Sequence, residues 1–81
     1  MSKMTYYVVL PFETSKRGRV TAGQAQQAQT GHQAIRMAER LAVQKGGAVA
    51  FSRAGDPDAG DFDEAVILGK FGDVPDEALV T

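Results

Sequence analysis

Residues 5–12 read TYYVVLPF, and this stretch decides the fold class. Aromatic and β-branched side chains pack well on a pleated surface but lose rotamer freedom in a helix, so the pattern predicts a strand. A period of two gives this strand two apolar faces, Tyr6, Val8, Leu10 and Phe12 on one and Tyr7 and Val9 on the other. Pro11 lacks a backbone N–H, so we expect it at the end of the strand or on a sheet edge.

One amphipathic helix is predicted over residues 30–45 (TGHQAIRMAERLAVQK). Apolar side chains recur there at spacings of three and four, namely Ala34, Ile35, Ala38, Leu41 and Ala42. Thr30 and Gln33 form a capping-box pattern at the start, and Gly46 follows Lys45 as a stop signal.

Two further apolar runs, residues 47–53 (GAVAFSR) and 62–71 (FDEAVILGKF), are typical of strands. Glycines and a proline in residues 54–61 (AGDPDAGD) predict a loop between them, so the two runs form an antiparallel hairpin with an acidic tip. Residues 15–19 (SKRGR) are expected to form a cationic turn in which Gly18 takes a positive φ.

The sequence therefore predicts one α+β domain over residues 1–81, with strand, helix, strand and strand in that order. We expect a small antiparallel sheet of three strands with the helix on one face, and an ordered core over about residues 4–72. Residues 20–29 are ambiguous between loop, helix and a short edge strand, which would be the fourth. Residues 73–81 carry few core candidates and are expected to form a loose tail.

Composition excludes several classes of function. Nine basic and ten acidic side chains are interspersed, so the chain lacks the basic surface that nucleic-acid binding requires. No cysteine and one histidine leave no disulfide and no structural zinc site. We expect no cofactor, no membrane contact and, because no export signal is visible, a cytoplasmic location.

The densest charge cluster lies in and after the predicted acidic loop, and its weak ligand candidates are Arg53, Asp56, Asp58 and Asp61. Closely spaced carboxylates can bind calcium or magnesium. The spacing does not match an EF-hand, however, because position six from Asp56 is Asp61 and position twelve is Ile67. We interpret the cluster as solvated turn residues. No catalytic constellation surrounds His32 or Ser52, so we expect no enzyme.

Self-association follows from the two apolar faces of the strands. One helix covers one side of a sheet. The other side would remain exposed to water, and about 1.5–3 kcal/mol of burial free energy would be lost for each large side chain. We therefore expect a homodimer, formed by stacking open faces or joining edges. The interface candidates are Tyr6, Tyr7, Val9, Phe51 and Ile67. The alternative is a monomer in which residues 20–29 and the tail cover the exposed face.

The function that these features favour is a non-enzymatic protein–protein interaction or regulatory module that binds itself, with an unidentified second protein as a further candidate partner. The alternative is a small-molecule or metal-ion binder that uses the acidic loop over residues 54–64.

Four segments resemble a family of short, uncharacterised bacterial proteins. These are RMAERLA at residues 36–42, GGAVAFSR-GDP at 46–57 with Ala54 interposed, GDFDEAVIL at 60–68 and FGDVP at 71–75. The resemblance covers about half of the chain and implies a bacterial, cytoplasmic protein. It implies no activity, ligand or catalytic residue.

Overall fold

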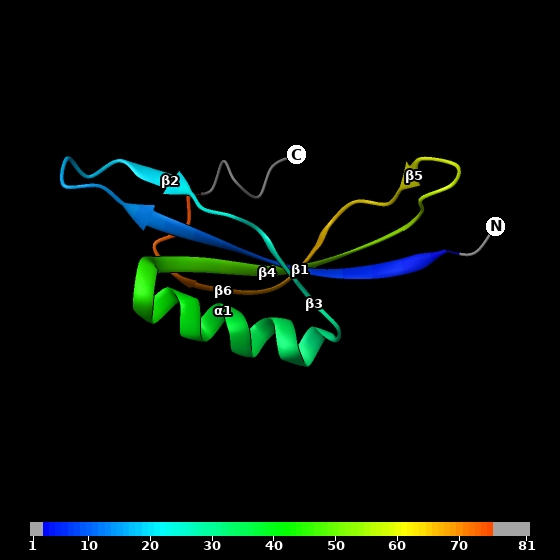
Figure 1. The fold of residues 1–81 in the computed structure, drawn as a ribbon, viewed down its shortest axis with the longest axis horizontal. Coiled ribbons are helices and arrows are strands. Elements are labelled where there is room, and N and C mark those ends of the chain that lie inside the picture. The colour runs from blue at the N-terminus through cyan, green and yellow to red at the C-terminus, as the bar shows by residue number, and fades with distance from the viewer. Residues whose placement is uncertain (1–2, 76–81) are drawn as a thin grey trace.

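The computed structural model describes residues 3–75, which form one helix and a curled antiparallel sheet (Figure 1). The elements are β1 (Met4–Thr14), β2 (Val20–Ala22), β3 (Gln26–Ala28), α1 (Gly31–Lys45), β4 (Gly46–Asp56), β5 (Asp61–Phe62) and β6 (Val66–Gly72). The α+β class is confirmed. The predicted order and the count of three or four strands are wrong, because the sheet has six strands, three before the helix and three after it. Of the predicted tail, residues 76–81 lie outside the described part of the chain.

The two long strands β1 and β4 form the centre of the sheet, and Val8 lies opposite Phe51. The short strands β2 and β3 pair with the outer side of β1, while β5 and β6 pair with the outer side of β4. Residues 20–29 therefore contribute two short strands, where the sequence left one as an option. The result is an elongated molecule of 46 × 23 × 16 Å with a turn at each end of the long axis.

The hairpin after β4 departs from the prediction in its boundaries. β4 continues to Asp56 through half of the predicted loop, and the predicted strand over residues 62–71 is split into β5 and β6. Phe51 pairs with Ile67, and Gly55 pairs with Phe62. Between these two pairs β4 contributes four residues, whereas the opposite chain contributes five. The extra residue prevents continuous pairing, so the ladder is interrupted at residues 63–65, where the Asp63 N–H still donates a hydrogen bond of 2.8 Å to the Ala54 carbonyl.

Pro11 lies inside β1, so its expected position at a strand end or sheet edge is wrong. β3 pairs with residues 7–9 of β1 and β2 with residues 12–14, and a gap separates the two ladders. The Pro11 carbonyl points into this gap, where it accepts a hydrogen bond of 2.8 Å from the Gly23 N–H. Because the N and O of a strand residue point to the same side, the missing N–H of Pro11 also falls in the gap.

The helix boundaries agree with the prediction. Thr30 is the N-cap, and its Oγ1 accepts a hydrogen bond of 3.0 Å from the Gln33 N–H. Gly46 closes the helix in the left-handed conformation at φ 114°, and its N–H donates to the Ala42 carbonyl. Gly18 takes the expected positive φ of 82° in the turn between β1 and β2. No helix over residues 3–75 combines the length and apolar character needed to cross a bilayer.

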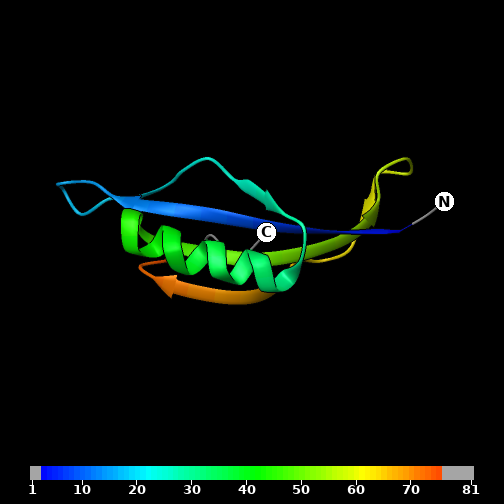
Figure 2. The same cartoon turned by 60° about the horizontal axis from the view of Figure 1, so that its bottom comes forward.

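Helix α1 packs across β1, β4 and β6, and its predicted apolar stripe faces the sheet (Figure 2). The core beneath it consists of small side chains, namely Val9, Ala28, Ala34, Ala38, Ala48 and Ala50. Two of these alanines lie on α1 and two on β4, and all four are fully buried. Alanine on both sides lets the helix approach the central strand closely.

Candidate functional site

The side of the sheet away from α1 carries an exposed apolar surface, which we call the open patch. It comprises Tyr6 and Val8 of β1, Phe51 of β4, Phe62 of β5 and Ile67 of β6. Register places these side chains on one face, because Val8 lies opposite Phe51 and Phe51 lies opposite Ile67. Phe62 is 47% exposed and Ile67 is 41% exposed. The Tyr6 and Phe62 rings contact each other with centroids 6.3 Å apart.

The other half of this face is covered within the chain. After β6 the backbone turns at Gly72, and the Asp73 N–H donates a hydrogen bond of 2.9 Å to the Gly46 carbonyl. The Asp73 backbone then lies directly over Gly47, where a Cβ would come within 2.1 Å of its carbonyl oxygen. Phe12, opposite Gly47 in the ladder, is only 3% exposed. The segment at Asp73 therefore crosses over one half of this face, and the open patch occupies the other half, toward the start of β1 and the end of β4.

The five predicted interface residues divide between the two faces. Tyr6, Phe51 and Ile67 lie in the open patch. Val9 is fully buried beneath α1 and Tyr7 packs against the same core, so neither belongs to the open face. Sequence reasoning missed Val8 and Phe62. Val8 could have been found, because it is two residues from Tyr6 in the same strand and so lies on the same face. Phe62 reaches this face only through the pairing of β5 with Gly55.

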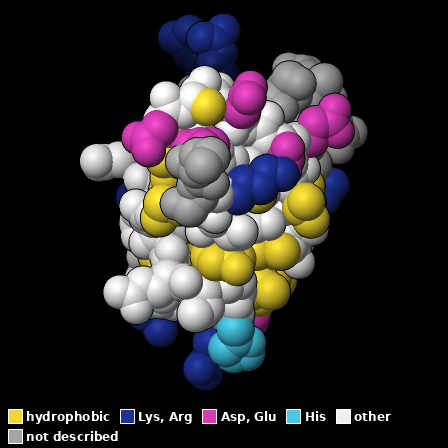
Figure 3. Space-filling view, turned by 90° about the vertical axis from the view of Figure 1, so that its right-hand side faces the viewer, with side chains coloured by type: hydrophobic (Ala, Val, Ile, Leu, Met, Phe, Trp, Pro, Cys, Tyr) yellow, Lys and Arg dark blue, Asp and Glu magenta, His cyan; other side chains and the backbone are white. Residues whose placement is uncertain are grey.

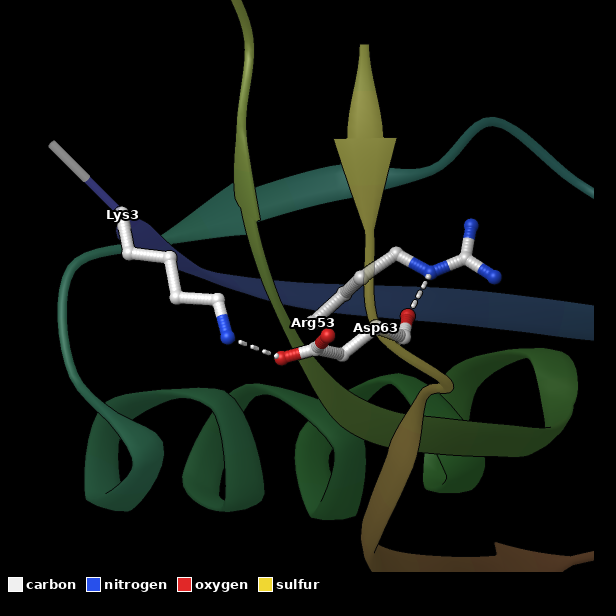
Figure 4. A network of polar contacts seen from close by, with 3 residues as sticks. All are labelled: Lys3, Arg53 and Asp63. Carbon is white, nitrogen blue, oxygen red and sulfur yellow. Dashed lines mark hydrogen bonds and ion pairs between the residues drawn. The ribbon is translucent and has the colours of Figure 1, made fainter. Parts of the chain in front are cut away.

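The acidic end of the molecule is organised around Asp63. Its carboxylate contacts the Lys3 ammonium at 2.9 Å, and its backbone carbonyl accepts a hydrogen bond of 3.0 Å from Arg53 Nε (Figure 4). Asp56 accepts a hydrogen bond of 3.0 Å from the Asp58 N–H and so shapes the turn. Figure 3 looks onto this end and shows acidic side chains grouped on one side of it, with basic side chains between them.

The candidate ligands lie near one another without converging on a point. Asp56 and Asp61 line an open depression of about 490 Å³ together with Lys3, Ala59, Phe62 and Asp63, while Asp58 and Arg53 are not part of its wall. Over residues 3–75 no three acidic or histidine side chains are grouped as ligands of one metal ion. The arrangement is a charged turn in which Lys3 and Arg53 both contact Asp63.

The Lys3–Asp63 pair gives a pH-dependent prediction. The hydrogen bond and charge of Asp63 raise the pKa of Lys3 above its ordinary value of 10.5. Because the folded-state pKa is the higher one, the stabilisation is present at neutral pH and is lost as the pH rises through it. In an NMR titration of the Lys3 side chain we expect a midpoint above 10.5, which Asp63→Asn returns to the ordinary value. An unchanged midpoint in that variant would show that the pair does not form in solution.

The opposite end of the molecule is basic. The turn over residues 15–19 carries Lys16, Arg17 and Arg19, and contains no acidic residue. It is closed by hydrogen bonds from the Ser15 N–H to the Arg19 carbonyl at 2.7 Å and from the Gly18 N–H to the Ser15 carbonyl at 2.9 Å. All of its side chains are exposed. The open patch therefore lies between two turns of opposite charge.

The chain matches no protein-family model, no curated protein and no solved structure.

Proposed function

We propose that this protein is a non-enzymatic interaction module that binds a second copy of itself through the open patch. The observation that carries the proposal is the position of five large apolar side chains on a sheet face that α1 does not cover. The function that we propose is binding through this face, and the partner that we propose is a second copy of the chain.

Energetics favour covering this surface. Full burial of a large apolar side chain contributes about 1.5–3 kcal/mol, and Ile67 and Phe62 each keep more than two fifths of their surface exposed. A domain of this size, without disulfides, has a total stability of only about 5 kcal/mol. Burial of the open patch on both copies therefore contributes a gross free energy of the same order as the stability of the fold, from which the entropy cost of association is subtracted.

Stacking of faces is favoured over joining of edges. β6 carries one edge of the sheet beside the patch, and a register shift between Ala50 and Phe51 interrupts its ladder. Gly69 and the exposed Lys70 lie on the same strand. Bulges, glycines and lysines are the features that keep an edge strand from pairing with another chain.

Sedimentation equilibrium of matched variants tests the proposal. We expect the wild-type chain to form a species of twice its 8.6 kDa mass. Ile67→Lys places a charge within the contact and should weaken association by at least about tenfold, since an unpaired buried charge costs several kcal/mol. Val43→Lys introduces the same charge on α1, where Val43 is 88% exposed, and should leave association unchanged.

Two outcomes would overturn the proposal. One is a wild-type chain that stays monomeric at every concentration. The other is equal association by the Ile67→Lys and Val43→Lys variants, each verified as folded by circular dichroism, because this would place the interface elsewhere.

A further inference from the structure

The two ends of the molecule define an orientation for the dimer. We define the cationic tip as residues 15–19, with three basic side chains and no acidic one, and the acidic tip as residues 56–64, with five acidic side chains, of which Asp63 is paired with Lys3. They lie at opposite ends of a 46 Å axis, and both rise from the sheet on the side away from α1 (Figure 1). The tips therefore flank the open patch on its own side.

We propose that two copies stack head to tail, with the cationic tip of each copy against the acidic tip of the other. This inference rests on the proposed function, because it specifies how the open patches meet. The two-fold axis lies in the interface, perpendicular to β1, and passes near the pair formed by Val8 and Phe51. Such an axis makes the patch self-complementary and brings opposite ends together.

The spacing of the tips fits this axis. β1 runs six residues beyond Val8 to Thr14, next to the cationic tip, and β4 runs five residues beyond Phe51 in the other direction to Asp56, where the acidic tip begins. At ~3.3 Å per residue these separations are about 20 Å and about 17 Å. Rotation about the axis therefore brings the bases of the two tips within about 3 Å of register, a distance that long basic side chains span and that salt at physiological concentration does not fully screen.

Charge also selects against the other orientation. A two-fold axis along β1 would place the cationic tips together and the acidic tips together. Like charges brought together at an interface weaken association, whereas the head-to-tail arrangement makes two attractive contacts. The apolar patch thus supplies affinity and the tips supply orientation.

Charge reversal in three variants tests the orientation. The first variant replaces Lys16, Arg17 and Arg19 by Glu, and the second replaces Asp58, Asp61 and Glu64 by Lys. In the head-to-tail dimer each variant alone makes two repulsive contacts, so we expect the dissociation constant to rise at least about tenfold at low salt. A third variant that carries both sets of changes exchanges the two charges and should regain wild-type association.

Cross-linking gives a second, geometric readout, because the chain has no cysteine of its own. Arg17→Cys and Ala59→Cys each place one thiol on a tip. With a short bismaleimide we expect covalent dimers when the two variants are mixed and few when either is treated alone.

The inference is overturned if each single-cysteine variant links mainly to itself, or if reversing one tip leaves the dissociation constant unchanged. Neither result would affect the proposed function, provided that Ile67→Lys still dissociates the dimer. A monomeric wild-type chain would instead remove the proposed function itself, so the two failures are distinguishable.

Discussion

Ala38→Leu should lower the free energy of unfolding by about 3 kcal/mol, a large part of the stability of a domain of this size. Ala38 is fully buried at the contact between α1 and the sheet, where the core includes Ala48 and Ala50 of β4. Three added carbon atoms have no space there, so the helix must move away from the central strand or the new side chain must leave its preferred rotamer. Urea unfolding followed by circular dichroism measures the change.

Val43→Leu is the matched control on the same helix. Val43 is 88% exposed, so a leucine there meets no neighbour and should change the free energy of unfolding by less than about 0.5 kcal/mol. If Ala38→Leu proved equally neutral, the close approach of α1 to β4 would not hold in solution.

Gly47→Ala should lower the free energy of unfolding by about 1–3 kcal/mol, because a single methyl group collides with the backbone that crosses the sheet. A Cβ at Gly47 would lie 2.1 Å from the Asp73 carbonyl oxygen and 2.7 Å from its carbonyl carbon. Backbone cannot rotate away as a side chain can, so the crossing segment has to shift. The hydrogen bond from the Asp73 N–H to the Gly46 carbonyl is then lost as well. Thermal unfolding should show a Tm lower by about 4–8 °C for each kcal/mol.

Gly31→Ala makes the same chemical change with the opposite expected sign. A Cβ at Gly31 would meet the Leu68 and Tyr7 side chains at 3.5 Å, which is ordinary van der Waals contact. Gly31 begins α1, where alanine is the better helix former, so we expect stabilisation by up to about 1 kcal/mol. Two destabilised variants would indicate that loss of glycine, and not the crossing at Gly47, determines the result.

The open patch could be predicted only in part from the sequence. Alternation in residues 5–12 separates Tyr6 and Val8 from Tyr7 and Val9, and the structure keeps that separation. Because both sets are apolar, alternation cannot indicate which set lies beneath the helix, so both were interface candidates. Phe62 joins the patch through pairing between strands, which is a long-range property with no local pattern.

Three local features could be predicted from neighbouring residues alone: the strand character of residues 5–12, the capped helix from Thr30 to Gly46, and the positive φ at Gly18. Each depends on side-chain branching, hydrogen bonds or backbone freedom within a few residues. Three other features follow from the packing of distant segments: which apolar set of β1 faces the helix, where the ladder after β4 breaks, and the position of two oppositely charged turns beside one exposed face. These features depend on register and packing between segments far apart in the chain, where small differences in pairing energy choose among patterns that the local sequence allows equally.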